Sequence, residues 1–270
     1  MKLKMGKFIL TIMVILLPVP LFGQIERFQL SLNGGSGYTL LKNTIPDSKS
    51  TENLGYNLNI QFNLAISRTF GIGIGAGFSK YSSDISLDKY YNTTAAIDNE
   101  GDNYEYRIYG SNLKENQLIN FIEIPFLLVL QNQDHKKFKM SLGIGAKAMM
   151  PVQSHFNGTS GEIETRGFYS QYNVELSNMP NHGFDIYPIK EVSGQLPTKV
   201  SYAALIELGA NISLGKIYLT FCLSGTYGLS NIGVSRELFT VDNGYQSLSS
   251  ISSNCEAFSI GAKAGLAFPF

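Results

Sequence analysis

The chain ends in Lys263-Ala-Gly-Leu-Ala-Phe-Pro-Phe270, and this stretch decides its fold. A polar residue, Lys263, a glycine, Gly265, and two aromatic residues spaced by two, Phe268 and Phe270, make up a β-signal. Outer-membrane β-barrels present this signal to the machinery that inserts them. Because the termini of soluble proteins tend to fray, a final strand that runs to the last residue favours a membrane barrel. We therefore expect that insertion machinery and the outer-membrane lipid to be partners of the chain.

The other end of the chain predicts export. Residues 1–23 combine the positive charges of Lys2, Lys4 and Lys7 with a short apolar run over residues 8–17 and a small residue, Gly23. A membrane-spanning helix needs about 20 apolar residues, so this run indicates a secretory signal peptide instead. We expect residues 1–23 to be the signal peptide and residues 24–270 to be the barrel domain.

The composition excludes several classes of protein. Charged residues make up 16% of the chain, against about 25% in typical soluble domains. The formal net charge is zero, so no nucleic-acid partner is predicted. The 27 glycines, 15 tyrosines and 17 phenylalanines are typical of a β-rich chain with small polar residues in place of charged ones. No residue pattern predicts a cofactor.

Alternation of apolar and polar residues, the pattern of a strand with two different faces, recurs along the whole mature chain. Residues 56–67 show it most clearly, with apolar side chains at even positions and Asn, Gln or Ser at nearly all of the odd ones. The expected strands are residues 28–38, 56–67, 70–79, 118–131, 138–148, 202–213, 217–227 and 258–268. Each is long enough to cross a bilayer at a tilt, which takes about 9–11 residues.

The connections between these strands alternate in length. Residues 40–53, 84–116, 151–199 and 231–254 form long connections, whereas residues 67–69, 132–136 and 215 form short ones. Short periplasmic turns and long outside loops are typical of outer-membrane barrels. The sequence thus predicts an all-β fold, an eight-stranded antiparallel up-and-down transmembrane β-barrel with long extracellular loops, located in the cell outer membrane with both termini periplasmic.

Aromatic residues on the apolar face fall at both ends of the expected strands, as side chains at the two membrane interfaces do. A soluble barrel with an apolar interior would instead carry many charges on its outer face. The expected interface residues are Phe28, Phe70, Phe138 and Phe268 at the periplasmic end, and Tyr38, Tyr56, Phe78, Tyr202, Tyr227 and Phe258 at the outer end.

The polar face carries four charged residues at a similar depth, Glu123, Lys147, Glu207 and Lys263. They would form an interior charge network, because an unpaired buried charge is costly. Two interpretations remain: a charge-paired plug that closes the bore, or a path for protons or ions. An eight-stranded barrel is just wide enough for side chains to fill, which favours the plug.

Catalytic and metal sites have little support. His135 falls in a short turn, and His155 and His182 fall in one long loop without a third ligand nearby. Acidic residues 98–103 could bind calcium or be solvated surface charge. Hairpin pairing of the last two strands places Cys222 opposite roughly residue 263. Cys255 is then too far from Cys222 for a disulfide, so both cysteines are expected to be free thiols. Because the sequence does not group a nucleophile, a base and an acid, we predict that the chain is not an enzyme.

Two motifs resemble a known family. The stretch Phe121-Ile-Glu-Ile-Pro-Phe-Leu-Leu128 resembles the strand with the sequence Glu-Ile-Pro in PorT-like outer-membrane β-barrel proteins, and Tyr227-Gly-Leu-Ser-Asn-Ile232 resembles the end of their seventh strand. The resemblance implies an integral outer-membrane barrel, and its founding member is implicated in secretion and surface maturation of exported proteins. Pro125 within this strand fits a bulge or a local bend.

Three functions follow from these observations. The leading hypothesis is a non-enzymatic barrel whose tyrosine-rich outside loops bind or organise protein partners at the cell surface. The alternative is an accessory role in protein secretion, as the PorT-like resemblance implies. An outer-membrane hydrolase is the third, although no nucleophile, base and acid group together in the sequence.

Overall fold

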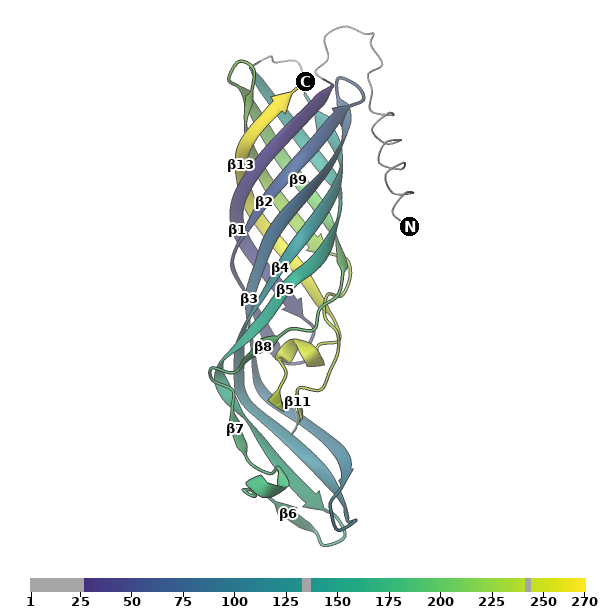
Figure 1. The fold of residues 1–270 in the computed structure, drawn as a ribbon, viewed down its shortest axis with the longest axis vertical. Coiled ribbons are helices and arrows are strands. Elements are labelled where there is room, and N and C mark those ends of the chain that lie inside the picture. The colour runs from purple at the N-terminus through teal and green to yellow at the C-terminus, as the bar shows by residue number, and fades with distance from the viewer. Residues whose placement is uncertain (1–26, 133–136, 241–243) are drawn as a thin grey trace, which may run out of the picture.

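Eight long antiparallel strands form a closed ring in the computed structural model, which describes residues 27–132, 137–240 and 244–270 (Figure 1). Each strand pairs with its neighbour in chain order, and the last pairs with the first. The strands are β1 (Phe28–Asn43), β2 (Ser48–Ala65), β3 (Phe70–Ile97), β4 (Asn103–Gln131), β5 (Phe138–Tyr169), β9 (Ser201–Ser213), β10 (Tyr218–Gly228) and β13 (Cys255–Pro269). The predicted fold class is confirmed.

Two other predictions can be placed against this ring. The expected signal peptide, residues 1–23, lies outside the described residues. Cys222 pairs with Lys263, as the sequence predicted, and both cysteines are free thiols. Within the described part of the chain, no helix is long and apolar enough to cross a membrane.

The ring closes where β1 meets β13, and glycine permits the close approach of these strands. A Cβ atom added to Gly265 would lie 1.9 Å from the carbonyl oxygen of Leu32, and one added to Gly35 would lie 2.1 Å from that of Ala262. Any larger side chain would push the two strands apart. The backbone N–H of Phe270 then donates to the carbonyl of Phe28 at 2.8 Å, which completes the seam.

Three strands continue far beyond the ring and correct two predicted loops. Residues 84–116 are not a loop but the continuation of β3 and β4, which are joined by a short turn at residues 98–102. Residues 151–169 likewise continue β5. We call the part formed by β3, β4 and β5 beyond the ring, together with the segments packed on it, the distal extension. Figure 1 shows it at the end of the molecule opposite the C-terminus.

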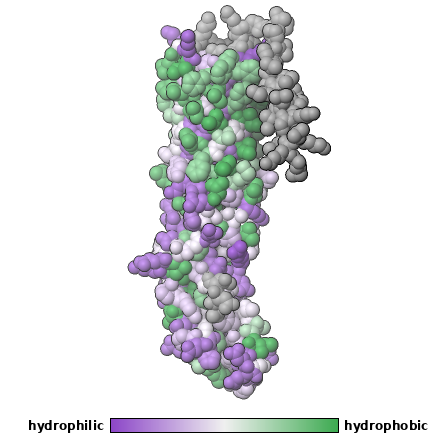
Figure 2. All heavy atoms as spheres, viewed as in Figure 1, coloured by the Kyte–Doolittle hydropathy of each residue, from purple (hydrophilic) through white to green (hydrophobic). Residues whose placement is uncertain are grey.

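The sequence analysis missed the continuation of these strands because the two faces of β3 exchange polarity along its length. Up to Phe78, apolar side chains point outward and glycines point inward. From Tyr81 onward the inward positions become apolar, with Ile85 and Leu87 buried, whereas Asp84 and Asp88 are exposed. Figure 2 shows the result, with hydrophobic residues gathered on the barrel and hydrophilic ones on the extension.

The first predicted loop, residues 40–53, is corrected in the same way. β1 runs to Asn43 and β2 begins at Ser48, so only a tight turn joins them. Asp47 closes this turn with a positive φ of 59°. The final connection, residues 229–254, remains long and contains β11 (Phe239–Thr240), β12 (Gly244–Tyr245) and the short helix η2 (Leu248–Ile251).

The rest of the predicted loop over residues 151–199 returns along β5. The short strands β6 (Val174–Leu176), β7 (Ile186–Pro188) and β8 (Ser193–Gln195) all pair with β5, and η1 (Pro180–His182) lies between β6 and β7. These segments and η2 enclose a hydrophobic core that fills the distal end of the bore and the inner face of the extension. Its largest fully buried members include Tyr81, Ile85, Leu113, Ile119, Phe121, Met149 and Ile163.

Candidate functional site

The four interior charges form two ion pairs. Lys147 Nζ lies 2.7 Å from Glu123 Oε1, and both side chains are largely buried. The Ser79 hydroxyl donates to the same carboxylate at 2.6 Å, and Lys147 also donates to the Tyr81 hydroxyl at 3.2 Å. Lys263 contacts Glu207 in the second pair. Each charge therefore meets its opposite within the bore.

The space around these pairs is too small for a ligand. Two neighbouring cavities of about 40 and 60 Å³ lie along the polar bore, and both touch Glu207 and Lys263. Beyond them the buried side chains of Tyr81, Phe121 and Met149 occupy the distal end of the bore. This filling favours the plug interpretation over an ion path.

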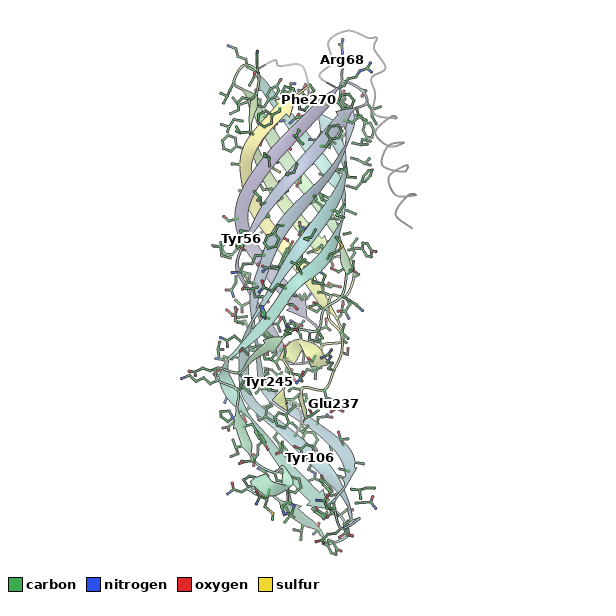
Figure 3. The ribbon with its side chains drawn as sticks, viewed as in Figure 1. Tyr56, Arg68, Tyr106, Glu237, Tyr245 and Phe270 are labelled. Carbon is green, nitrogen blue, oxygen red and sulfur yellow. The ribbon has the colours of Figure 1, made fainter. Side chains whose placement is uncertain are left out.

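The predicted insertion signal lies on the strand that closes the ring. Lys263 pairs with Gly35, Gly265 with Asn33 and Phe268 with Leu30, all across the β1–β13 seam. Lys263 thus belongs to both the predicted signal and the second ion pair. Figure 3 places Phe270 at the end of the barrel that carries the C-terminus.

The predicted interface aromatics lie on the outer surface of the barrel. Tyr56, which Figure 3 labels on the outside near mid-length, packs on Phe78 with ring centroids 6.4 Å apart. Tyr227 and Phe258 pack edge to face at 4.8 Å, and Phe28 stacks on Phe62 at 5.7 Å. The side chains of Tyr38, Phe138 and Tyr202 are exposed, and Phe70 and Phe268 are half-buried.

A buried carboxylate in the extension has no signal in the sequence analysis. Glu115, on β4, is almost fully buried and accepts hydrogen bonds from the hydroxyls of Ser247 at 2.6 Å and Tyr245 at 2.7 Å. The amide of Gln117 donates at 2.7 Å, and the backbone N–H of Leu248 donates at 3.2 Å. Burial raises the pKa of Glu115, while these donors, with Ser247 first, act in the opposite direction. This network fastens the final connection to the sheet.

The network continues from Glu115 to the first strand. Gln117 accepts from the Asn43 amide at 3.0 Å, and Asn43 accepts from the Ser249 hydroxyl at 3.0 Å. Residues of β1, β4 and the final connection are therefore linked in one buried polar layer. Such a layer holds the base of the extension in one arrangement because every broken bond would leave a buried polar group unpaired.

Ion pairs hold the outer surface of the extension. Arg107 on β4 contacts Glu105 at 2.7 Å and Glu175 of β6 at 3.0 Å. Arg166 on β5 contacts Glu164 at 2.8 Å and the same Glu175 at 3.0 Å. Each arginine is therefore satisfied by neighbouring glutamates, which raises the pKa of both guanidinium groups. The two arginines do not pair with the acidic residues of the tip.

The tip is aromatic and acidic. Tyr104 stacks on Tyr169 with ring centroids 5.2 Å apart and meets Phe184 edge to face at 5.7 Å. The Tyr169 hydroxyl donates to Asp98 at 3.2 Å, and the Tyr172 hydroxyl donates to Asp102 at 3.1 Å. These residues line an open hollow of about 660 Å³. The backbone N–H of Asp102 and those of Glu100 and Gly101 lower the pKa of Asp98, so this carboxyl is ionised at neutral pH.

The histidines and acidic residues do not assemble into a centre. His155 lies on β5 at the base of the extension, paired with Leu118 and Gln195, whereas His182 lies in η1 at the tip and stacks on Phe184. His135 lies outside the described residues. Across the ranges that the structure describes, no three His, Cys, Asp or Glu side chains converge on a metal position. Calcium binding by residues 98–103 stays a prediction.

Comparisons with known proteins address the barrel as a whole. No curated protein matches the chain. Among solved structures, OprG from Pseudomonas aeruginosa is 12% identical, with 92% of this chain and 99% of that chain covered and a TM-score of 0.43. Neisserial surface protein A is 8% identical, with 92% and 100% covered and a TM-score of 0.39. Ail, the attachment invasion locus protein of Yersinia pestis, is 9% identical, with 90% and 99% covered and a TM-score of 0.31.

The family comparison covers most of the chain. Residues 22–233 match the family described as outer membrane protein beta-barrel domain. This match agrees with the closed eight-stranded ring, its apolar outer face and its filled polar bore. The chain belongs to the outer membrane protein β-barrel domain family.

Proposed function

We propose that the chain is a non-enzymatic outer-membrane barrel with periplasmic termini, whose distal extension stands outside the cell and binds a protein partner. The observation that carries this proposal is a set of exposed apolar and aromatic side chains far from the lipid-facing belt. Tyr91, Ile97, Tyr172 and Ile186 are 56%, 68%, 61% and 52% exposed. Ile97 and Tyr172 line the same hollow at the tip, and contiguous exposed apolar surface on the water-facing part of a protein marks interaction sites.

The rigidity of the extension supports this proposal. The Glu115 network, the two arginine clusters and the hydrophobic core hold the segments that carry the exposed side chains. A binding surface on such a scaffold loses little conformational entropy when a partner binds. A membrane anchor alone would need neither the core nor the long strands.

The orientation is supported by the lengths of the connections. Residues 66–69 and 214–217 make short turns at the end where β1 begins and the C-terminus lies, whereas the extension lies at the other end (Figure 1). Outer-membrane barrels place short turns in the periplasm and long segments outside. The extension is therefore available to molecules at the cell surface.

A photo-crosslinking experiment in intact cells tests the proposal. A photoreactive amino acid replaces Tyr172 in one strain and Tyr38, an equally exposed tyrosine of the barrel surface, in a matched control strain. We expect a defined protein adduct from position 172 alone. The purified partner should then bind the wild-type chain in lipid nanodiscs and bind a variant with both Tyr172→Ala and Ile186→Asp at least tenfold more weakly. Equal adducts at both positions, or none, would overturn the proposal.

The secretion role that the PorT-like resemblance implies makes a different prediction. A strain that lacks the chain would then retain a set of exported proteins in the periplasm. The surface-binding proposal predicts an unchanged profile of secreted and surface proteins. Quantitative mass spectrometry of the surface and secreted fractions therefore separates the two functions.

A further inference from the structure

The sheet of the extension has two long edges, of which one is covered by other strands and one is open. The edge of β5 is covered along its length by β8, β7 and β6, which pair with it in turn. The edge of β3 is paired with β2 only as far as Leu87, which lies opposite Ser48. From residue 88 to residue 97, no described segment pairs with the open side of β3.

Apart from Asp88 and Lys89 at its start, this open edge lacks the features that protect edge strands. Residues 90–97 read Tyr-Tyr-Asn-Thr-Thr-Ala-Ala-Ile, without charge, proline or glycine. Their register with β4 continues without a bulge from Lys89 opposite Ser111 to Ile97 opposite Asn103. Natural proteins usually protect an edge with charges, proline, bulges or a covering segment. An unprotected edge on an otherwise well-covered sheet indicates a surface that is kept open for pairing.

We infer that residues 89–97 of β3 bind an extended segment of a partner protein by β-strand addition. This inference rests on the proposed function and specifies how the partner is held. Every second residue of an edge strand directs its N–H and C=O outward, so a partner strand is recognised by its backbone. Nine residues span about 30 Å. The small side chains of Thr93, Thr94, Ala95 and Ala96 leave room for varied side chains on the added strand.

The charge of the tip specifies one end of this partner segment. Asp98, Glu100 and Asp102 follow the open edge directly, and the nearest arginines are already paired with other glutamates. A segment with a basic residue at the end next to the tip is therefore favoured. In the more stable antiparallel arrangement, that end is the N-terminus of the segment.

A second copy of the chain fits the edge less well. Two copies in one membrane point the same way, so their β3 strands could pair only in parallel, which is the slightly weaker arrangement. Such a dimer would also place the acidic residues Asp98, Glu100 and Asp102 of both copies side by side. Like charges at close range oppose this pairing.

The test uses the full chain in lipid nanodiscs and a fluorescent peptide, Arg-Arg followed by four Thr-Val repeats. A control peptide carries Pro-Pro in place of the second Thr-Val repeat, which removes donors from both of its edges. We expect binding of the first peptide only. Amide exchange measured by NMR should then show new protection at every second residue between 89 and 97.

Matched variants of the chain complete the test. Replacing Thr93 and Ala95 with lysine should weaken binding at least tenfold. The same change at Asn157 and Thr159, which lie on the covered β5, should leave binding within twofold. Equal binding of the proline peptide, no binding of either peptide, or protection elsewhere would overturn the inference. Protection of the edge without any peptide, together with a dimeric mass, would assign the edge to a second copy instead.

The photo-crosslinking experiment separates this inference from the proposed function. If the adduct at position 172 persists in the chain with lysines at positions 93 and 95, the surface still binds its partner and only β-strand addition fails. If no adduct forms in the wild-type chain, the proposed function itself fails.

Discussion

Replacing Glu115 with alanine should release the final connection from the sheet while leaving the barrel intact. Glu115 accepts hydrogen bonds from Tyr245, Ser247 and the backbone of Leu248, which all belong to that connection. The carboxylate and these three donor residues are all buried. The donors therefore cannot form hydrogen bonds with water instead. Figure 3 shows Tyr245 in the narrow region between the barrel and the extension.

The size of the effect follows from the donors that lose their acceptor. A buried donor without a partner costs about 1–3 kcal/mol. The Leu248 N–H cannot rotate away, whereas the two hydroxyls can find other acceptors in part. We therefore expect local stability to fall by roughly 3 kcal/mol, which increases the open population on the order of a hundredfold. Glu115→Gln keeps one acceptor oxygen and should cost about half as much.

Amide hydrogen exchange of the chain in detergent, followed by mass spectrometry, measures this opening. Residues 244–251 should exchange on the order of a hundredfold faster in the Glu115→Ala variant, whereas β9 should exchange at the wild-type rate. Glu52→Ala, which removes an exposed carboxylate from β2, is the control and should change neither segment. Unchanged exchange of residues 244–251 in the Glu115→Ala variant would refute the assigned role of this network.

Three further predictions concern pH, the bore and insertion. Because burial raises the pKa of Glu115, its contribution to local stability is full below the ordinary glutamate pKa of 4.5 and is lost as pH rises through the higher folded value. Exchange at residues 244–251, corrected for its intrinsic rate, should increase over that range, and Glu115→Gln should remove the trend. Glu123→Ala leaves the Lys147 charge buried alone and should lower the melting temperature of the barrel by roughly 10 °C; an unchanged value would count against the plug. Deleting Phe270 should reduce the amount of chain in the outer-membrane fraction without reducing its synthesis, and equal amounts would contradict the insertion signal.

The barrel could be predicted from the sequence because one rule holds over seven of the eight strands, the exception being β4, where the apolar side chains of Ile119, Phe121 and Leu127 also point inward. In the lipid-facing part of these seven strands, apolar side chains point outward and small polar ones point inward, so alternation identifies them. The extension escaped prediction because this rule reverses near Lys80. Tyr81, Ile85 and Leu87 continue the period of two with the opposite polarity, and this continuation is the signal that could have revealed the longer strands.

The interior charges could be predicted from the sequence, whereas the Glu115 network could not. Glu123, Lys147, Glu207 and Lys263 stand out because the lipid-facing strands contain almost no other charges. Glu115 lies in a segment rich in polar residues, so its carboxylate is not distinctive in the sequence. Its partners Tyr245 and Ser247 are 130 and 132 positions away, and their convergence depends on the path of the final connection over the sheet. Local sequence patterns contain no information about contacts between residues so far apart in the chain.

The unbroken ladder between β3 and β4 sets a rule for how this family member can change in length. Their register is constant from Phe70 opposite Leu130 to Ile97 opposite Asn103. An insertion of one residue in one strand would turn every following side chain to the wrong face. Two residues added to both strands would preserve every face and raise the tip by about 7 Å. The hairpin can thus be lengthened or trimmed in paired steps while the barrel stays the same.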